Sequence, residues 1–367
     1  MAKNRRIAIF LGHPAHFHLF KNAASKLMSD GYTVDFLIKR KDVLEDLLKN
    51  AGFTYYVVRK KERTKTSRIV LIMSVFGLVW HNMLHYIIKR PKIVIGTYGS
   101  LVERLLGIPL VTCNEDDAEV VPRFAETAYP FSNVILAPSV CNCGKWEKKA
   151  IKYQSYHELA YLHPDNFTPD KDVAAAYISL DKPYVLMRFA KLSAHHDSNI
   201  KGISTDLAIK IIDMLKDRFN VYITSERPLD ERLEAFRLKI KPIDIHHVMA
   251  FASFYIGDSQ TMAAESGVLG VPFVRFNDFV GRIGYLKDLE DHYHLGFGVK
   301  TDEVGRLLET VTYLSNLPDR GKIFSDRRAK MLTEKIELSK FLVWFIENYP
   351  RSKKVLQEDS DYQFNFR

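Results

Sequence analysis

Short apolar runs rich in β-formers alternate with segments of helical periodicity along almost the whole chain. Residues 7–11 form the first apolar run, and residues 17–29 have apolar positions at helical spacing. The same succession continues to a run at residues 133–137, expected to be the last strand of the first half, and restarts after residue 170. Alternation of this kind predicts an α/β protein whose parallel strands are joined by right-handed helical crossovers.

The length of 367 residues exceeds one ordinary core, so we expect two domains. Residues 161–170 contain two prolines and little periodicity, which is typical of a linker. The predicted domains are 1–165 and 170–334, and a C-terminal helical segment, 335–367, is expected to return to the first domain. A single helix is predicted at 326–348. Because ligands of parallel sheets bind beyond the carboxyl ends of the strands, two such sheets predict a cleft between the domains.

The net charge of +9 favours anionic partners such as nucleotide phosphates or an acidic membrane surface. Nucleic acid is not expected, because no basic helix or aromatic sheet motif stands out. Three cysteines in a long chain argue against a disulfide framework, and the first apolar run is too short for a signal-peptide core. We therefore expect a cytoplasmic protein. Cys141 and Cys143 lack partners at metal-ligand spacing, so we expect no metal and no cofactor.

A basic run at 59–68 precedes a largely apolar segment at 69–88. That segment is nearly long enough to span a bilayer, but His81, Asn82 and His85 interrupt its second half. A buried helix is favoured, and the alternatives are a helix lying on an anionic membrane surface and a helix that spans the membrane. The surface-helix interpretation would place the protein peripherally at the inner face of the membrane, through residues 59–88.

The strongest local signal lies at residues 254–272. A predicted strand ends at Ile256, small and hydroxylated residues follow, and a helix begins. Amides at a helix start lack partners and carry positive potential, so a diphosphate would bind there without any lysine. Glu265, further along the helix, is placed to bind ribose hydroxyls. The alternative is an ordinary strand–turn–helix unit with Asp258 or Ser259 as the helix N-cap.

This stretch resembles the nucleotide-binding segment of GT-B-type glycosyltransferases and of the non-hydrolysing UDP-N-acetylglucosamine 2-epimerases. Both carry an aspartate, small residues, a helical glutamate and Leu-Gly-x-Pro. The matching residues here are Asp258, Ser259, Thr261, Glu265, Leu269, Gly270 and Pro272. The epimerases have paired glycines where this chain has Gln260 and Thr261, which is a departure at the point where the backbone would approach the ligand.

The resemblance implies a GT-B-like fold, in which two Rossmann-like domains face each other across a cleft. The first would be the acceptor side and the second the nucleotide-sugar side. It also implies that the turn from Gly257 to Thr261, with Ser259 and Gln260, faces the phosphates and that Glu265 binds the ribose. The whole chain resembles an uncharacterised bacterial and archaeal family, domain of unknown function 354. That match rests on residues 12–18, 96–100 and 257–277.

His13, His16 and His18 follow the first predicted strand. In many inverting glycosyltransferases a histidine or carboxylate in this loop deprotonates the acceptor hydroxyl, and a neutral imidazole suits that task. The resemblance therefore makes His16 the first candidate for the base and His13 the second. The alternative is that these histidines only cap or pack the following helix.

Glu115, Asp116 and Asp117 follow the strand predicted at 109–112. Several carboxylates together are costly unless cations or hydrogen bonds meet them. The corresponding region of the epimerases supplies catalytic carboxylates, so Glu115 and Asp116 are catalytic candidates. The epimerases have glutamate, alanine and glycine in sequence there, which this chain lacks. A solvated acidic loop is the alternative.

Several polar residues of the second half follow predicted strands or begin a helix. Arg188 and Lys191 would neutralise the charge that develops on a leaving nucleoside diphosphate. The epimerases have a catalytic histidine in the comparable loop, followed by Arg-x-Glu-Asn, and here only the histidine, His195 or His196, is present. Ser225 ends the next strand. His246 and His247 begin a helix at a turn that often meets the base, and capping of that helix is the alternative.

These residues predict a glycosyltransferase that moves a sugar from a nucleotide-sugar, first of all a UDP-sugar, to a saccharide or lipid-linked acceptor in surface polysaccharide synthesis. The missing epimerase residues favour transfer over a nucleotide-sugar 2-epimerase, which stays the first alternative. A non-catalytic nucleotide-binding protein on the same scaffold is the second.

Overall fold

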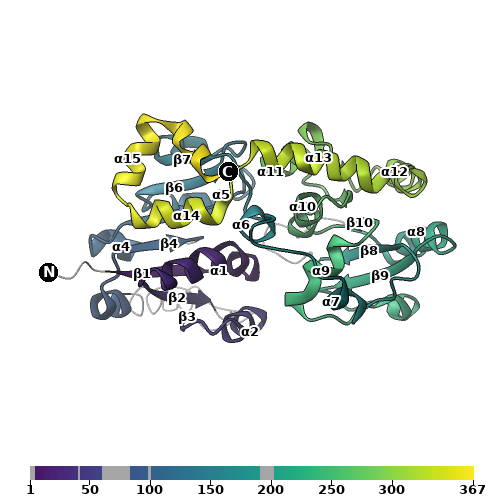
Figure 1. The fold of residues 1–367 in the computed structure, drawn as a ribbon, viewed down its shortest axis with the longest axis horizontal. Coiled ribbons are helices and arrows are strands. Elements are labelled where there is room, and N and C mark those ends of the chain that lie inside the picture. Colours follow the sequence, from purple (N-terminus) through teal and green to yellow (C-terminus); the bar gives the residue numbers. More distant parts are fainter. Residues whose placement is uncertain (1–4, 40–41, 60–82, 98–100, 191–201) are drawn as a thin grey trace. The chain divides into compact units, whose positions relative to one another are not determined.

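A computed structural model describes residues 5–39, 42–59, 83–97, 101–190 and 202–367. The chain divides into two compact units (Figure 1). Unit 1 comprises Met1–Tyr161 and Ile336–Arg367, and unit 2 comprises Leu162–Lys335. Each unit is a parallel sheet with flanking helices, which confirms the predicted α/β class.

Unit 1 contains a seven-stranded sheet in the order β3-β2-β1-β4-β5-β6-β7, with every neighbouring pair parallel. β1 is apolar and buried from Ile7 to Leu11, as expected of a central strand covered on both faces. The strands are β1 (Arg6–Leu11), β2 (Thr33–Lys39), β3 (Tyr55–Arg59), β4 (Ile93–Gly96), β5 (Leu110–Cys113), β6 (Val134–Pro138) and β7 (Ala150–Tyr153).

The helices of unit 1 come from both ends of the chain. The last long helix, α14, contacts α1 and lies beside it (Figure 1). The Glu337 carboxylate begins α14 by accepting the backbone amides of Ser339 and Lys340. The helices are α1 (Pro14–Ser29), α2 (Asp42–Asn50), α4 (Leu101–Leu105), α5 (Pro122–Ala128), η1 (Gly144–Lys149), α6 (Leu159–Leu162, which ends in unit 2), α14 (Leu338–Glu347), α15 (Arg351–Glu358) and η5 (Ser360–Phe366).

Unit 2 contains a five-stranded parallel sheet in the order β12-β11-β10-β8-β9. Its strands are β8 (Tyr184–Phe189), β9 (Asn220–Ser225), β10 (Phe254–Gly257), β11 (Phe273–Phe276) and β12 (Gly296–Val299). Its helices are α7 (Lys171–Ala175), α8 (Thr205–Leu215), η2 (Glu231–Phe236), η3 (Pro242–Asp244), α9 (Ile245–Ala250), α10 (Gln260–Val268), α11 (Gly284–Lys287), η4 (Asp288–His292), α12 (Val304–Asn316) and α13 (Arg320–Glu334).

The structure corrects several predicted boundaries. The predicted helix at 326–348 is two helices, because the backbone is extended at Lys335 between α13 and α14. The helix predicted from residue 17 begins at Pro14, so His16 and His18 lie within α1 and not in a loop. The strand at 133–137 is not the last of its half, since β7 follows it.

The segment predicted to be buried or to lie on a membrane falls largely outside the described residues. Residues 60–82, which include most of the basic run and most of the apolar run, are not described, whereas residues 83–89 are helical. Within the described part of the chain, no helix is both long and apolar enough to cross a bilayer. Contact with a membrane surface stays a prediction.

Candidate functional site

In unit 2, the central strand β10 ends at Gly257, which pairs with Arg188 of β8 and Arg275 of β11. A Cβ atom at Gly257 would lie 2.3 Å from the hydroxyl oxygen of Tyr255. Glycine is therefore required where the strand passes the Tyr255 phenol. The turn that follows carries the predicted phosphate-binding residues.

Ser259 is the N-cap of α10, with φ −84° and ψ 125°, and its Oγ accepts the Met262 amide at 3.4 Å. The amides of Gln260 and Thr261, at the first two helical positions, have no acceptor within the helix. Both residues are half-buried, as is Ser259, so a ligand can reach them. The N-cap interpretation is thus correct for Ser259, and it leaves two amides available for an anion.

Asp258 is 2% exposed, so it lies beneath this turn. Its Oδ1 accepts the Ala190 amide at 2.6 Å, and its carbonyl accepts Asn277 Nδ2 at 3.1 Å. Burial raises the pKa of Asp258, while the Ala190 amide and Arg227 oppose that shift. The side chain joins the ends of β8 and β10, and Asn277 adds the end of β11. Asn277 was expected only as the boundary of the family match.

The Arg188 guanidinium forms an ion pair with the Glu226 carboxylate. Ser225 Oγ accepts the Arg227 amide at 3.1 Å and donates to the Arg227 carbonyl at 2.6 Å, so it closes a local turn. The Arg227 guanidinium lies over the Phe189 ring, 4.9 Å from its centroid. The remaining predicted phosphate ligands of this edge, Lys191 and His195, lie outside the described residues.

Glu265 is 5% exposed, and its Oε1 lies 2.9 Å from Nε2 of the equally buried His246. His247 Nδ1 accepts the Asp170 amide at 2.9 Å, and its ring lies 4.8 Å from that of Phe167. His246 therefore contacts the predicted ribose ligand directly, while His247 joins α9 to the start of α7. The contact of His246 with Glu265 was not predicted, because nothing in the sequence pairs the two residues.

In unit 1, β1 leads into α1 as β10 leads into α10. His13 is the N-cap of α1, and its Nδ1 accepts the Ala15 amide at 3.3 Å. His16 Nδ1 accepts the amides of Gly12 and His13, each at 3.1 Å, and lies 2.6 Å from Thr97 Oγ1. Both imidazoles thus cap the helix, as the alternative interpretation expected.

Thr97 reaches His16 because β4 ends close to β1. Gly96 has φ +157°, and a Cβ atom there would lie 2.2 Å from the Phe10 carbonyl oxygen. Only glycine allows this approach of β4 to β1. His18 is 8% exposed and packs near the Tyr161 ring, with centroids 5.2 Å apart.

The acidic residues after β5 are not a solvated loop. Asp117 is 6% exposed and its Oδ1 accepts the Asn142 amide at 2.7 Å. Glu115 Oε2 lies 3.3 Å from His157 Nδ1 and accepts the His157 amide at 3.3 Å. Asp116 is half-buried, and burial raises its pKa to about 6.

His157 was not predicted as a functional residue. It is 7% exposed, and burial lowers its pKa to about 4, against the opposing charges of Glu158 and Asp116. Its Nε2 is buried and has no hydrogen-bond partner among the described residues. His157 follows β7, a strand that the sequence did not indicate, so its position beside Glu115 could not be anticipated.

Cys113, Cys141 and Cys143 are buried free thiols. Cys141 Sγ donates to the Glu115 carbonyl at 2.8 Å, which supports the acidic turn. No group of three or more potential metal ligands occurs in the described part of the chain.

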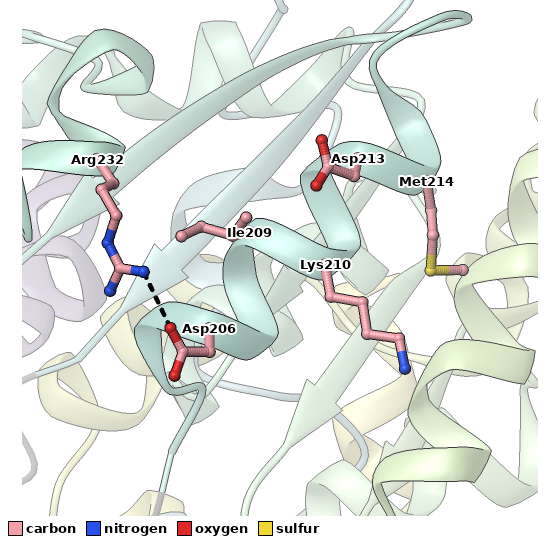
Figure 2. Close-up of a pocket in the computed structure, with 6 residues that line it drawn as sticks. All are labelled: Asp206, Ile209, Lys210, Asp213, Met214 and Arg232. Carbon is pink, nitrogen blue, oxygen red and sulfur yellow. Dashed lines mark hydrogen bonds and ion pairs between the residues drawn. The ribbon is translucent and has the colours of Figure 1, made fainter.

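A shallow hollow on the surface of unit 2 contains none of the predicted site residues. It is lined by Asp206, Ile209, Lys210, Asp213, Met214 and Arg232. Figure 2 shows that the Asp206 and Arg232 side chains meet at its rim, where their ion pair measures 3.1 Å. Both partners are exposed, so this pair is solvated and offers little to a ligand.

The two sheets and their connections define an α/β protein of the GT-B fold, as comparison with solved structures shows. A kitacinnamycin glycotransferase has 12% identity and a TM-score of 0.61, covering 94% of this chain and 99% of its own. The Neisseria meningitidis UDP-GlcNAc 2-epimerase bound to UDP-GlcNAc has 13% identity and a TM-score of 0.59, with coverage of 90% and 100%. The S. aureus MnaA–UDP structure has 12% identity and a TM-score of 0.66, with coverage of 95% and 97%.

The family model described as protein of unknown function (DUF354) matches residues 6–278. The chain belongs to this family, as its resemblance predicted. No curated protein matches the sequence.

Proposed function

We propose that this protein is a glycosyltransferase that transfers a sugar from a nucleotide-sugar donor to a saccharide or lipid-linked acceptor. Among nucleotide-sugars, a UDP-sugar is the favoured donor. The observation that carries the proposal is the start of α10, where Gln260 and Thr261 present amides that the helix cannot satisfy. Such a site binds a diphosphate through backbone dipoles and needs no metal ion.

The surroundings of the turn support this proposal. Gly257 ends the central strand directly before the turn, and Arg188 lies at the end of the neighbouring strand. Glu265, supported by His246, would accept the ribose hydroxyls. Solved structures of the same fold hold UDP-GlcNAc, UDP and thymidine diphosphate, which indicates the class of ligand to test first.

In the proposed reaction, unit 2 holds the donor and stabilises the departing nucleoside diphosphate, while unit 1 supplies the group that activates the acceptor. The Arg188 guanidinium would exchange Glu226 for phosphate oxygens when the donor binds. Charge developing on the leaving group is then met by fixed amides and one cation, without reorganisation at the moment of transfer.

Two measurements test the proposal. Calorimetry with UDP should show binding, and incubation with a panel of UDP-sugars and saccharide or polyprenyl-phosphate-linked acceptors should release UDP and form a new glycoside. A protein that binds UDP but turns over no donor–acceptor pair would be the non-catalytic alternative. A protein that binds neither UDP nor thymidine diphosphate would disprove the proposed donor site.

A 2-epimerase is the second candidate, favoured by the half-buried Asp116 carboxylate beside Glu115, since proton abstraction needs such a group. Incubation with UDP-N-acetylglucosamine in deuterated water, without acceptor, separates the two. Deuterium at carbon 2 of the recovered sugar would favour epimerisation, whereas unlabelled sugar together with acceptor-dependent UDP release would favour transfer.

A further inference from the structure

The groups able to move a proton in unit 1 stand at the carboxyl ends of neighbouring strands. β1, which leads to His16, pairs with β4, and β4 pairs with β5, which leads to Asp116. The carboxyl ends of parallel strands meet at one edge of the sheet. Two candidates for the acceptor-activating base therefore share that edge, and the hydrogen bonds of each decide between them. The inference below rests on the proposed function and names its base.

The His16 ring is held in the tautomer that cannot act as a base from its outer nitrogen. Its Nδ1 accepts the amides of Gly12 and His13 at 3.1 Å, so this nitrogen carries no hydrogen. A neutral imidazole then carries its hydrogen on Nε2. A histidine base needs the opposite arrangement, with Nδ1–H bonded and Nε2 free to accept.

Of the three carboxylates after β5, two are engaged by their neighbours. Asp117 accepts the Asn142 amide, and Glu115 faces the His157 ring and amide. The Asp116 carboxylate has no hydrogen bond to another described residue, although its backbone carbonyl accepts Asn114 Nδ2 at 2.7 Å. The residue as a whole is half-buried.

The charges that face Asp116 favour a proton acceptor near neutral pH. Burial raises its pKa to about 6, with Asp117 adding to the rise and His157 opposing it. The Tyr129 hydroxyl and the Cys141 thiol also lie in its field. A carboxylate with a pKa close to the working pH is a more effective base than an ordinary one.

His157 keeps Glu115 and Asp116 in separate roles. Its Nδ1 and amide both lie 3.3 Å from Glu115 Oε2, so Glu115 is held toward the buried ring. Because burial keeps the ring neutral at pH 7, His157 opposes the rise in the pKa of Asp116 less than a full positive charge would, and that pKa stays at about 6. His157 is thus a positioning residue.

We propose that Asp116 takes the proton of the acceptor hydroxyl and that His16 acts as a hydrogen-bond donor, from Nε2, to the bound saccharide. As the acceptor oxygen bonds to the anomeric carbon, its O–H bond breaks and the proton moves to an Asp116 carboxylate oxygen. The bond from the anomeric carbon to the diphosphate oxygen breaks, and its electron pair leaves with the nucleoside diphosphate.

The His16 part is tested without substrate. Nitrogen-15 NMR of the full chain labelled at histidine, with the His16 signals assigned by their loss in His16→Asn, reports which ring nitrogen carries the hydrogen. We expect a protonated Nε2 and an unprotonated Nδ1 at about pH 7 to 8, where an unperturbed histidine is neutral. A protonated Nδ1 with an open Nε2 would overturn the assignment.

The Asp116 part has one arm that needs no turnover. Carbon-13 NMR of the Asp116 carboxyl, assigned by its loss in Asp116→Asn, should titrate near pH 6. A midpoint near the ordinary value of 3.8 would overturn the proposal. Either NMR arm can refute the inference even if the protein transfers no sugar, so its failure is distinguishable from failure of the proposed function.

The kinetic arm uses UDP release from UDP-N-acetylglucosamine, or from the UDP-sugar that the donor panel selects. Asp116→Asn should lower kcat/KM by about 100-fold or more and remove the acid limb of its pH profile. His16→Asn should keep that limb. Glu119→Gln, an exposed carboxylate of the same segment, is the matched control and should leave the rate unchanged. An Asp116→Asn variant with an intact acid limb, or a His16→Asn variant without one, would refute the assignment.

A further variant, measured in the same kinetic assay, tests the role of His157. His157→Asn should shift the acid limb of kcat/KM to higher pH, because Glu115 is no longer held and its charge then raises the pKa of Asp116. A purely structural role for His157 would lower the yield of folded protein without moving the limb. An unmoved limb in a correctly folded His157→Asn protein would therefore exclude the positioning role.

Discussion

The first turns of α1 and α10 occupy equivalent places, each directly after a central strand of its sheet, yet their amides have opposite fates. In α1, the first residue is Pro14, which has no amide hydrogen, and the Ala15 amide is capped by His13. In α10, Ser259 caps the Met262 amide, and the amides of Gln260 and Thr261 stay without an acceptor in the helix.

This difference separates two kinds of chemistry on one fold. The first turn of α1 has no backbone donor left for a phosphate, because a proline and the imidazole caps account for its first positions. Any chemistry there therefore depends on side chains. A helix start with open amides binds an anion through the backbone. Unit 1 accordingly gathers titratable side chains at its strand ends, whereas unit 2 offers amides beside the buried carboxylates of Asp258 and Glu265.

The largest expected effect is on the pH dependence of the unfolding free energy, and it concerns His157 and Asp116 of unit 1. The pKa of His157 is lowered from 6.5 to about 4, so its contribution to stability is present above pH 6.5 and is lost as pH falls toward 4. The pKa of Asp116 is raised from 3.8 to about 6, so its contribution has the opposite sign and grows as pH falls through that range. In the unsubstituted protein the two contributions largely cancel.

When one of the two groups is substituted, the pH-dependent contribution of the other should therefore no longer be cancelled. Relative to the unsubstituted chain, Asp116→Asn should lose up to about 3 kcal/mol of unfolding free energy between pH 6.5 and 4, and His157→Asn should gain a similar amount. Urea unfolding at both pH values measures this. Parallel pH dependences in both variants would show that unit 1 does not hold this pair as described.

The contrast between the two helix starts can be removed by Gln260→Pro, which gives α10 the first residue of α1. Ser259 has the extended backbone that a following proline requires, and proline is favoured at the first helical position. Loss of one charge-assisted amide bond should weaken UDP binding by about 2 kcal/mol, measured by calorimetry. Gln260→Ala keeps the amide and is the control. Equal affinities in the two variants would mean that the Gln260 amide does not contact the ligand.

Glu265→Gln tests whether the buried Glu265 carboxylate of unit 2 contributes to nucleotide binding. The amide can still bond to His246, whereas Glu265→Ala would remove this hydrogen bond from the buried ring. If the carboxylate accepts ribose hydroxyls, UDP affinity should fall by about 1 to 2 kcal/mol in calorimetry. Glu309→Gln, an exposed glutamate of α12, should leave affinity unchanged. Unaltered binding by the Glu265→Gln protein would restrict this residue to a structural role.

The smallest effect is expected for the closed helix start. His16→Ala removes the acceptor of the Gly12 and His13 amides and should lower the unfolding free energy of unit 1 by about 1 kcal/mol. His16→Gln supplies the acceptor usual at this position of a capping box and should recover most of the loss. Thermal unfolding compares the two. If both variants lose equally, the cap is not what the ring contributes.

Much of the fold is predictable because its signals are local. Apolar runs such as residues 7–11 and the turn after Ile256 state the strand–helix succession directly. β7 and β12 were missed for local reasons as well: β12 is Gly-Phe-Gly-Val, and β7 is a four-residue edge strand containing a lysine. The sequence predicts one continuous helix at 326–348 because no proline or glycine marks the break at Lys335.

The site divides in the same way. The open amides of α10 follow from a strand, a small-residue turn and a helix that are consecutive in the chain, so the sequence alone predicts where an anion would bind. Its supports are not consecutive. Glu115 and His157 are 42 residues apart, and Asp258 and His246 reach Asn277 and Glu265 across 19 residues each.

The tertiary structure alone decided which carboxylate after β5 has no hydrogen bond to another described residue, which backbone amides and hydroxyl lie against His16 Nδ1, and that His157 is buried. The physical reason is that protonation and hydrogen bonding depend on burial and on partners brought together by packing, and neither quantity is encoded in the local pattern of residues. The alternation of strands and helices along the chain places the turns at the carboxyl ends of the strands in each sheet. Packing then decides which chemistry the residues of those turns can perform.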